Sequence, residues 1–326
     1  MAFEFEPRSF LKGESCRVQN YNHNPVMVAE VLAGLGVHAG GRYADGTLGG
    51  VGHAAAILRE SHPNGWLYGC DRDGVALEVA ATRLAGFAGR FELRRGNFCD
   101  LSDWVPAGVC DGVLFDLGVS SPQLDESGRG FSFQQEGPLD MRMDTRQSLT
   151  AADLLNQTGQ DDLARIFWEY GDERDSRRFA RAIEMDRKVR PFRSTRQLAE
   201  LIERLSPRGA RKTHPATKVF QALRIAVNDE IGALERGLAG ALKILKPAGR
   251  LAVITFHSLE DRVVKDFGRR MARDYLIDGE VDVPELRRPC APTVLVVTRK
   301  AIQPGADELA ANPRSRSAQL RIIEKI

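Results

Sequence analysis

Segments with strand character alternate with segments of helical periodicity over about the first third of the chain. Predicted strands cover residues 42–45, 66–71, 91–95 and 112–116, and predicted helices cover residues 25–35, 53–60 and 74–84. Strands separated by helices of this length form right-handed βαβ units, in which consecutive strands run parallel. The alternation therefore predicts an α/β fold built on a mostly parallel sheet.

The alternation stops in the middle of the chain and resumes in its last third. Residues 120–144 are rich in glycine and proline and show no periodicity, and residues 148–228 carry only helical patterns. A long helix then leads into a strand at residues 250–256. The helix expected at residues 258–271 has Ser258 as its predicted N-cap. The central segment is thus predicted to be a helical insertion within the sheet.

Two last strand signals, at residues 293–298 and 319–324, have no helical crossover between them. We expect them to close the sheet as an antiparallel pair. The chain then divides into an N-terminal extension, a sheet domain in two segments, and an insertion that includes the aperiodic loop. The predicted boundaries are 1–22 for the extension, 23–125 and 229–326 for the sheet domain, and 126–228 for the insertion.

Composition excludes several classes of protein. No apolar run approaches the ~18–20 residues that a membrane helix requires. The N-terminus lacks the basic and then apolar pattern of a signal peptide, so we expect a cytoplasmic protein with no membrane contact. The five cysteines form no C-x-x-C pair and the six histidines are scattered, so we expect neither disulfides nor a metal site. The sequence sets no oligomeric state.

Charge is unevenly distributed along the chain, although the formal net charge is only +2. Residues 172–224 hold fifteen basic and seven acidic residues, a local balance of +8, which leaves −6 for the remainder. A basic surface on an otherwise acidic protein suits a polyanion, although solvated helix faces can carry the same charge. We take Arg187, Lys188 and Arg190 as candidate phosphate contacts.

A glycine-rich loop, DGTLGGVGH at residues 45–53, lies between the first predicted strand and its helix. Glycines allow a ligand to approach the backbone closely, and a helix N-terminus offers unpaired N–H groups. Dinucleotide-binding and adenosylmethionine-binding proteins share such loops. Here an acid, Asp45, precedes the glycines, where it could accept hydrogen bonds from a ligand ammonium.

Asp71 ends the second predicted strand. A carboxylate in this place suits a ribose diol, because it can accept hydrogen bonds from both hydroxyls. The alternative is that Asp71 caps the helix that begins near Asp73.

Asp116 ends the fourth predicted strand and is followed by a Ser-Ser-Pro-Gln turn at residues 120–123. Carboxyl ends of parallel strands line the crevice where open α/β sheets bind ligands. The turn is similar to the Ser/Asn/Asp-Pro-Pro-aromatic turn of enzymes that methylate exocyclic amines. The amine lone pair is delocalised into the base ring, so such a site must accept its N–H protons and align the nitrogen with the methyl donor.

Many segments, in order along the chain, resemble the bacterial 16S ribosomal RNA cytosine-N(4)-methyltransferase family. The longest are His23-Asn24-Pro25-Val26, Asp45 to His53, Asp71-Arg72-Asp73, Phe115 to Asp125, Arg129 to Phe133, Pro138 to Asp144, His214 to Thr217, Phe220 to Arg224, Val227 to Glu230, Thr255 to Arg262 and Asn312 to Ala318. The resemblance implies a class I, Rossmann-like methyltransferase that uses S-adenosyl-L-methionine. It also implies a cytidine in the decoding region of the small ribosomal subunit as the substrate.

The resemblance implies a set of cofactor contacts and a catalytic turn. Implied contacts are Gly50, Val51, Gly52, His53, Asp71, Phe98, Asp116 and Gln123, and the candidate catalytic residues are Asp116, Ser120, Ser121, Pro122 and His257. Phe98 suits an apolar wall beside adenine, or a core position. Val51 departs from the family, which usually has glycine there. Since valine tolerates positive φ poorly, either the angle is negative here or the loop differs.

Several residues are candidates for contact with RNA. His257 could bond the cytosine or its phosphate, or be satisfied by neighbouring carbonyls. Phe131 and Phe133 could stack the target base, or pack within the loop. Arg314 and Arg316 are expected to contact phosphates or to help close the loop over the site.

Three rival functions remain open from the residues alone. A nicotinamide-dependent dehydrogenase would have G-x-G-x-x-G, whereas the loop reads G-x-x-G-G-x-G from Gly46. A non-catalytic RNA-binding protein would not need Asp71, Asp116 and the Ser-Ser-Pro-Gln turn together. A DNA amine methyltransferase would usually carry a strand-rich recognition region, and no such pattern is visible.

Overall fold

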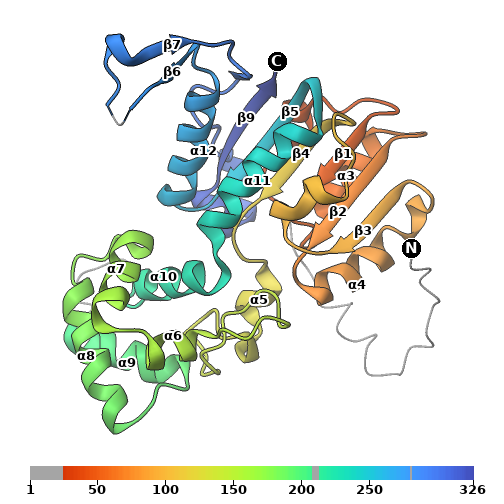
Figure 1. Ribbon diagram of the computed structural model, residues 1–326. Helices are drawn as coiled ribbons and strands as arrows, with labels where there is room; N and C mark the ends of the chain where they lie inside the picture. The colour runs from red at the N-terminus through yellow and green to blue at the C-terminus, as the bar shows by residue number, and fades with distance from the viewer. Residues whose placement is uncertain (1–24, 208–212, 280) are drawn as a thin grey trace.

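The computed structural model describes residues 25–207, 213–279 and 281–326. The predicted extension, residues 1–22, lies outside the described residues. A seven-stranded sheet forms the centre of the sheet domain, in the order β3-β2-β1-β4-β5-β9-β8 (Figure 1). Its strands are β1 (Arg42–Asp45), β2 (Trp66–Asp71), β3 (Phe91–Arg95), β4 (Cys110–Asp116), β5 (Leu245–Thr255), β8 (Val294–Val296) and β9 (Gln319–Lys325).

The first five strands run parallel, and β9 and β8 are antiparallel to their neighbours. This confirms the predicted class I methyltransferase sheet with an antiparallel C-terminal end. The register of the strands places their terminal aspartates at one edge of the sheet. Asp45 pairs with Gly69 and Leu114, and Asp116 pairs with Ile254. The acids that end β1, β2 and β4 therefore share the carboxyl edge of the sheet.

Helices bury apolar side chains against both faces of the sheet. They are α2 (Val28–Leu35), α3 (Gly52–Glu60), α4 (Gly74–Arg83), α11 (Glu230–Ile244) and α12 (Ser258–Met271). One core joins Val31, Ile57 and Val79 to the sheet, and the other joins Leu238 and Phe267. Burial of a side chain of this size contributes about 1.5–3 kcal/mol, so these two cores hold the carboxyl edge in place.

The insertion has a core of its own. Its helices are α6 (Ala151–Gln157), α7 (Gln160–Gly171), α8 (Ser176–Val189), α9 (Thr195–Leu205) and α10 (Thr217–Asn228), and they lie apart from the sheet in Figure 1. Leu163, Phe167 and Phe179 are at most 1% exposed and pack in this core. Ser194 caps α9 by accepting from the Gln197 N–H, as helical N-caps do. In the part of residues 148–228 that the structure describes, the named elements are all helices, as predicted.

Several details differ from the sequence-based expectation. His257, and not Ser258, caps α12, because its ring accepts from the Glu260 N–H and the Glu260 carboxylate reaches back to the cap. Proline 25 precedes α2, whose N-cap is Met27 with φ 56°. A small hairpin of β6 (Tyr275–Ile277) and β7 (Arg287–Pro289) was not predicted, because three-residue strands carry too short a pattern.

Candidate active site

A pocket opens at the carboxyl edge of the sheet, above β1, β2, β4 and β5. The residues that line it come from the glycine loop, the ends of β2, β4 and β5, the start of the segment after β4, and α11 and α12. They include Gly46 to Gly50, Gly52, His53, Asp71, Phe98, Asp116 to Ser120, Gln123, Glu230, Phe256 and Glu260. The predicted residues Gly50, Gly52, His53, Asp71, Phe98, Asp116, Ser120 and Gln123 are thus brought together.

The glycine loop adopts a tight turn in spite of its valine. Val51 has φ 72° and ψ 2°, so the backbone angle is positive. Its side chain points away from the pocket into the core beneath α3 and is 1% exposed. At Gly52, an added Cβ would lie 2.4 Å from the Pro25 side chain. Val51 therefore adopts a left-handed backbone conformation that is strained for valine. Burial of its side chain offsets the free-energy cost of that strain.

Asp71 holds the glycine loop and faces the pocket. Its Oδ2 accepts from the Gly49 N–H and its Oδ1 from the Asp73 N–H, both at 2.9 Å. Burial raises the pKa of Asp71 to about 6, against the opposing effect of these two N–H groups. Asp73, not Asp71, caps α4 by accepting from the Val75 N–H. The N-cap alternative for Asp71 is therefore wrong.

Asp45 is buried at the end of β1. It is 1% exposed, and its Oδ1 accepts from the Thr47 N–H at 3.0 Å. Burial raises the pKa of Asp45 to about 6. Asp45 is not among the residues that line the pocket. The bond to Thr47 orders the loop, and the predicted contact of Asp45 with a ligand ammonium stays a prediction.

Asp116 and His53 form a buried pair in the floor of the pocket. His53 Nε2 lies 3.5 Å from Asp116 Oδ2, and His53 is 6% exposed. Burial lowers the pKa of His53, but the carboxylates of Asp116 and Asp45 outweigh it and raise the pKa above its ordinary value. Within the described residues, Asp116 Oδ1 and both ring nitrogens of His53 lack a hydrogen-bond partner. Buried polar atoms of this kind are suited to a ligand.

Phe98 and Gln123 both line the pocket. Phe98 is 9% exposed, and its ring centroid lies 4.8 Å from that of Phe115, so it is both a wall of the pocket and a member of the core. Gln123 accepts from the Ser120 N–H and donates to Asp73 Oδ2 at 3.0 Å. These bonds fix the start of α5 (Ser121–Asp125).

The candidate catalytic turn is only partly in the pocket. Ser120 lines it, whereas Ser121 and Pro122 begin α5 and are not among the lining residues. His257 lies just behind the lining residues Phe256 and Glu260. Ser121 and Pro122 form the first turn of α5, which Ser120 and Gln123 cap.

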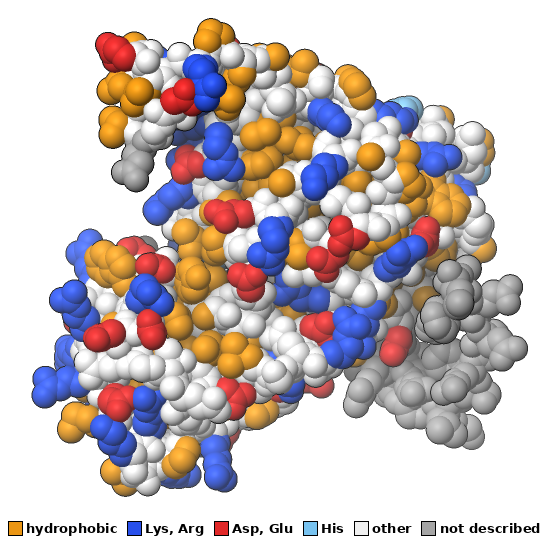
Figure 2. Space-filling model, in the orientation of Figure 1, with side chains coloured by type: hydrophobic (Ala, Val, Ile, Leu, Met, Phe, Trp, Pro, Cys, Tyr) orange, Lys and Arg blue, Asp and Glu red, His pale blue; other side chains and the backbone are white. Residues whose placement is uncertain are grey.

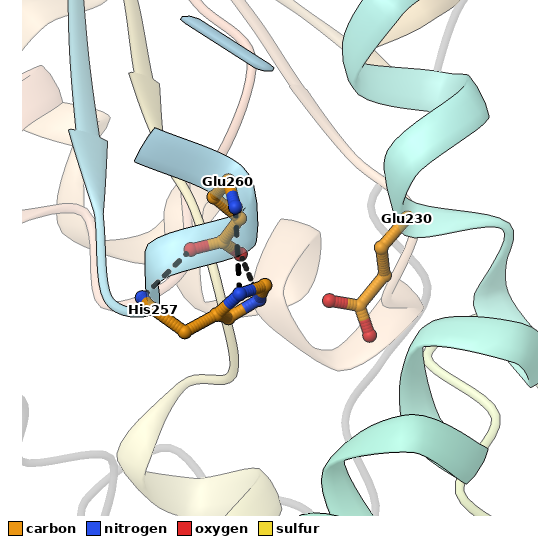
Figure 3. Close-up of side chains that lie close together, drawn as sticks. All are labelled: Glu230, His257 and Glu260. Atoms are coloured by element: carbon orange, nitrogen blue, oxygen red, sulfur yellow. Dashed lines mark hydrogen bonds and ion pairs between the residues drawn. The ribbon is translucent and has the colours of Figure 1, made fainter. Parts of the chain in front are cut away.

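Glu230 and Glu260 were missed as members of the site. Both line the pocket, from the first turns of α11 and α12. They are 30 residues apart in the chain, so no local spacing signals their proximity. Together with His257 they form a group in which one ligand-type atom of each side chain lies within 4.8 Å of the others (Figure 3). Arg224 donates to both oxygens of Glu230, and two backbone N–H groups donate to Glu260 Oε2. Both carboxylates therefore already accept hydrogen bonds within the protein.

The two phenylalanines proposed to stack a base differ in burial. Phe131 is 8% exposed and belongs to the core of the insertion. The Phe133 ring lies 4.6 Å from the His214 ring and 4.8 Å from the Phe220 ring, centroid to centroid. The structure therefore supports the packing alternative for Phe131, whereas Phe133 is only partly buried and its stacking role stays a prediction.

The basic candidates differ in what they are free to contact. The Arg187 guanidinium donates to the Leu155 and Thr158 carbonyls at 2.7 Å and closes the end of α6, so its predicted role at phosphate is wrong. Lys188 and Arg190 are exposed, and Lys188 pairs with Glu184. Figure 2 shows basic side chains spread over the visible face of the insertion and interleaved with acidic ones.

Two further arginines lie beside the segment after β4. Arg314 binds Asp125 through two hydrogen bonds of 2.6 and 3.3 Å, which joins the C-terminal region to α5. Arg316 is exposed. Arg314 therefore supports the predicted role in holding this segment over the site, while Arg316 keeps its side chain available at the surface.

Comparison with known proteins decides the family. The MraW methylase family matches residues 20–326 of the chain. The chain belongs to the MraW methylase family. It is therefore a methyltransferase, as the resemblance implied, and S-adenosyl-L-methionine is its methyl donor.

The chain is also similar to individual members named ribosomal RNA small subunit methyltransferase H. It is 50% identical over 311 residues to the protein of Symbiobacterium thermophilum, which covers 94% of this chain and 97% of that protein. It is 50% identical over 312 residues to the protein of Geobacter sulfurreducens, covering 94% and 99%. Among the described residues, no helix is long and apolar enough to cross a membrane.

The residues of the pocket fit this methyl donor. The N-terminus of α3 and the loop before it offer backbone N–H groups to a carboxylate. Asp71 offers an anionic acceptor to the ribose hydroxyls, and Phe98 offers an apolar wall to adenine. The unpartnered Asp116 Oδ1 and His53 ring nitrogens offer further polar contacts on the floor.

Proposed function

We propose that this chain methylates the exocyclic N(4) amine of a cytidine in the decoding region of 16S ribosomal RNA. The observation that carries the proposal is the shape of the pocket. One end is the cofactor wall of the glycine loop and Asp71, and the other end is lined by the segment after β4 and by Phe256 after β5. A donor and an amine bound at these two ends would meet beside Asp116.

The cofactor end is assigned to residues that face the pocket. Asp71 holds the ribose, the loop from Gly50 to His53 holds the amino acid part, and Phe98 and Gln123 flank adenine. S-Adenosyl-L-methionine supplies an activated methyl group on a sulfonium. The chain contributes orientation, because holding two reactants in line removes much of the entropic barrier to their reaction.

At the target end, Asp116 and Ser120 supply polar side chains beside the methyl donor and the target base. The turn that Ser121 and Pro122 begin keeps Ser120 in place. Transfer needs no covalent intermediate on the protein, since the nitrogen lone pair attacks the methyl carbon directly. Oriented acceptors favour the geometry in which that lone pair faces the donor.

We assign RNA contact to the exposed basic residues Lys188, Arg190 and Arg316, with Arg314 holding the adjacent segment. A cytidine inside folded ribosomal RNA must leave its stack to enter the pocket. The names of the relatives support the small ribosomal subunit as the partner, and with it a cytoplasmic location. The assigned chemistry requires no metal.

The test is methyl transfer from labelled S-adenosyl-L-methionine to small ribosomal subunits from cells that lack this protein, followed by nucleoside mass analysis. A new N(4)-methylated cytidine in 16S RNA is the expected result. Transfer to naked 16S RNA, measured in parallel, shows which form is the substrate. Absence of labelled cytidine in both, with cofactor binding confirmed by calorimetry, would overturn the proposal.

A further inference from the structure

Two carboxylates, one buried and one partly buried, lie at the target end of the pocket. Glu230 opens α11 and Glu260 lies in the first turn of α12, and both line the pocket beside Phe256. Figure 3 shows the Glu230 carboxylate directed toward the His257 ring and the Glu260 carboxylate, with a gap between the two helices. The cofactor contacts assigned above use neither glutamate.

Glu260 is anchored so that one of its oxygens is fixed in direction. Its side chain is 3% exposed, and its Oε2 accepts from the N–H groups of Phe256 at 2.8 Å and His257 at 3.3 Å. Its Oε1 lies 3.1 Å from His257 Nε2. Burial acts to raise the pKa of Glu260, but the His257 ring and the Arg224 guanidinium outweigh it and lower the pKa. Glu260 is therefore an oriented anion.

Glu230 is anchored by a different cation. Arg224 Nε and Nη2 each donate to one oxygen of Glu230 at 2.8 Å, and the two side chains are 16% and 10% exposed. A bidentate pair of this kind holds the carboxylate plane rigidly. Each oxygen keeps a further lone pair. Glu230 can thus accept another hydrogen bond without losing Arg224.

The spacing of these groups matches an amino group. An sp² amine holds its two N–H bonds about 120° apart, and N–H···O bonds of ~2.9 Å therefore place two acceptors roughly 5 Å from each other. One carboxylate oxygen of Glu230, one of Glu260 and one ring nitrogen of His257 all lie within 4.8 Å of one another, so the two carboxylates are close enough to accept from one amine. A ring oxygen or a thymine-like carbonyl donates no hydrogen bond, so it would bring only further acceptors toward the two carboxylates.

We propose that Glu230 and Glu260 each accept a hydrogen bond from one N–H group of the target exocyclic amine. His257 positions Glu260. This inference rests on the proposed function. As the nitrogen forms its bond to the methyl carbon, the sulfur keeps the electron pair of the broken C–S bond, and one proton passes from nitrogen to Glu260. An amine that has just been alkylated is acidic, so a carboxylate of low pKa suffices as the acceptor. Glu230 keeps the second proton in place throughout.

The test is single-turnover methyl transfer by Glu260→Gln and Glu230→Gln, with the exposed Glu235→Gln on α11 as the matched control. Glutamine preserves the capping interaction of residue 260, whereas at residue 230 it removes the charge partner of Arg224. Thermal melts therefore check that each variant is folded at the assay temperature. We expect Glu260→Gln to lose at least 100-fold and Glu230→Gln at least 10-fold in rate. Cofactor affinity by calorimetry should change less than 2-fold, and the control should match the parent.

The role of His257 is separated by the pH profile. His257→Asn keeps a side-chain cap for α12 but removes the ring from Glu260. Glu260 also faces Arg224 from α10 and Glu230 from α11, so the variant leaves those charges unchanged. We expect the acid limb of the rate profile to move to higher pH, because the pKa of Glu260 rises. An unmoved limb would overturn the positioning role.

The outcomes distinguish this inference from the proposed function. If the parent protein labels cytidine and Glu260→Gln does so within 2-fold of the parent rate, the assignment of Glu260 to the amine is wrong while the proposed function stands. If the parent labels no cytidine, the function itself fails. The parent protein could also lose activity in a chelator and regain it with Mn²⁺. That result would assign Glu230, His257 and Glu260 to a metal ion and would overturn the proposed hydrogen bonds to the amine.

Discussion

Arg129 donates from Nη1 to Asp73 Oδ2 at 2.7 Å, and this ion pair ties the segment after β4 to the first turn of α4. The two side chains are 14% and 7% exposed. Arg129 Nη2 also donates to the carbonyls of Arg142 and Met143. One guanidinium thus joins the N-cap of α4 to the backbone at Arg142 and Met143, in the loop that leads into the insertion.

We expect Arg129→Gln to lower the free energy of unfolding by about 3 kcal/mol, because it leaves the Asp73 carboxylate buried with a lost charge partner. Urea denaturation measures the change. Arg165→Gln is the matched control, since its pair with Asp162 at 2.9 Å is 65% and 57% exposed and should contribute less than about 1 kcal/mol. Equal losses in the two variants would contradict the structural role of Arg129.

Asp71→Asn should weaken binding of S-adenosyl-L-methionine by about 1.5–3 kcal/mol, because the ribose hydroxyls lose a charged acceptor. Asparagine retains one oxygen for the Gly49 or Asp73 N–H, so the loop should stay folded. Calorimetry measures the affinity, and the exposed Asp103→Asn serves as the control. An unchanged dissociation constant would remove Asp71 from the cofactor site.

The same carboxylate predicts a pH dependence of cofactor binding. The pKa of Asp71 in the free protein is about 6, raised by burial. Below that pH the group is protonated and can offer only a neutral acceptor, so affinity should fall as pH drops from 7 to 5. The parent protein should show this fall and Asp71→Asn should lack most of it. Parallel curves for the two proteins would assign the effect to another group.

Raised carboxyl pKa values also set how the stability of the free protein depends on pH. Asp45, with a pKa of about 6 against an ordinary 3.8, retains a proton that the unfolded chain has released. Stability from this group is therefore present below about pH 4 and is lost as pH rises to about 6. Asp45→Asn should flatten that decline in thermal melts taken across pH 4–7. A decline as steep as in the parent would show that Asp45 does not cause it.

Val51→Gly tests whether strain or burial dominates in the glycine loop. Removing the left-handed strain of valine should stabilise the fold by ~1–2 kcal/mol. Loss of a fully buried valine side chain costs ~1.5–3 kcal/mol, and the freedom of glycine in the unfolded chain costs ~0.5–1 kcal/mol more. We therefore expect a net loss of roughly 1 kcal/mol in chemical denaturation. A more stable variant would show that strain outweighs packing at this position.

Neutralising Lys188 and Arg190 should weaken RNA binding and reduce its salt dependence, by a slope of up to ~0.9 per lost phosphate contact. Arg187→Gln should behave differently, because its guanidinium binds carbonyls of α6 and the following turn. That variant should lose stability while the salt slope stays near that of the parent. An unchanged slope in the double variant would make Lys188 and Arg190 a solvated face only.

The sheet could be predicted from sequence because its signals are local. β1, β2 and β3 begin and end at the predicted residues, and Asp71 and Asp116 lie at the pocket as their strand ends require. Asp45 also ends a strand, yet its side chain turns inward. The Thr47 N–H, two residues later, donates to this carboxylate. Whether the carboxylate accepts from Thr47 or from a ligand depends on the fold of the loop.

The target end of the pocket could not be predicted in the same way. Glu230 and Glu260 meet because α11 and α12 pack on the same core, which is a tertiary relationship with no spacing signature. The segment from Thr255 to Arg262 was singled out by resemblance, but His257 was the residue chosen there. Phe131 shows the opposite error, since an aromatic residue in a loop suits stacking and packing equally until its neighbours are known.

The position of the insertion also affects how the sheet folds during synthesis of the chain. β4 ends at Asp116, and its sheet partner β5 begins only at Leu245. At 5–20 residues per second, roughly 6–25 s of synthesis separate the two strands. During that interval β4 has an unpaired, aggregation-prone edge, which the helices of the insertion cannot pair. Mutations that slow folding of the insertion should therefore reduce the yield of protein from cells before they alter the activity of the molecules that fold.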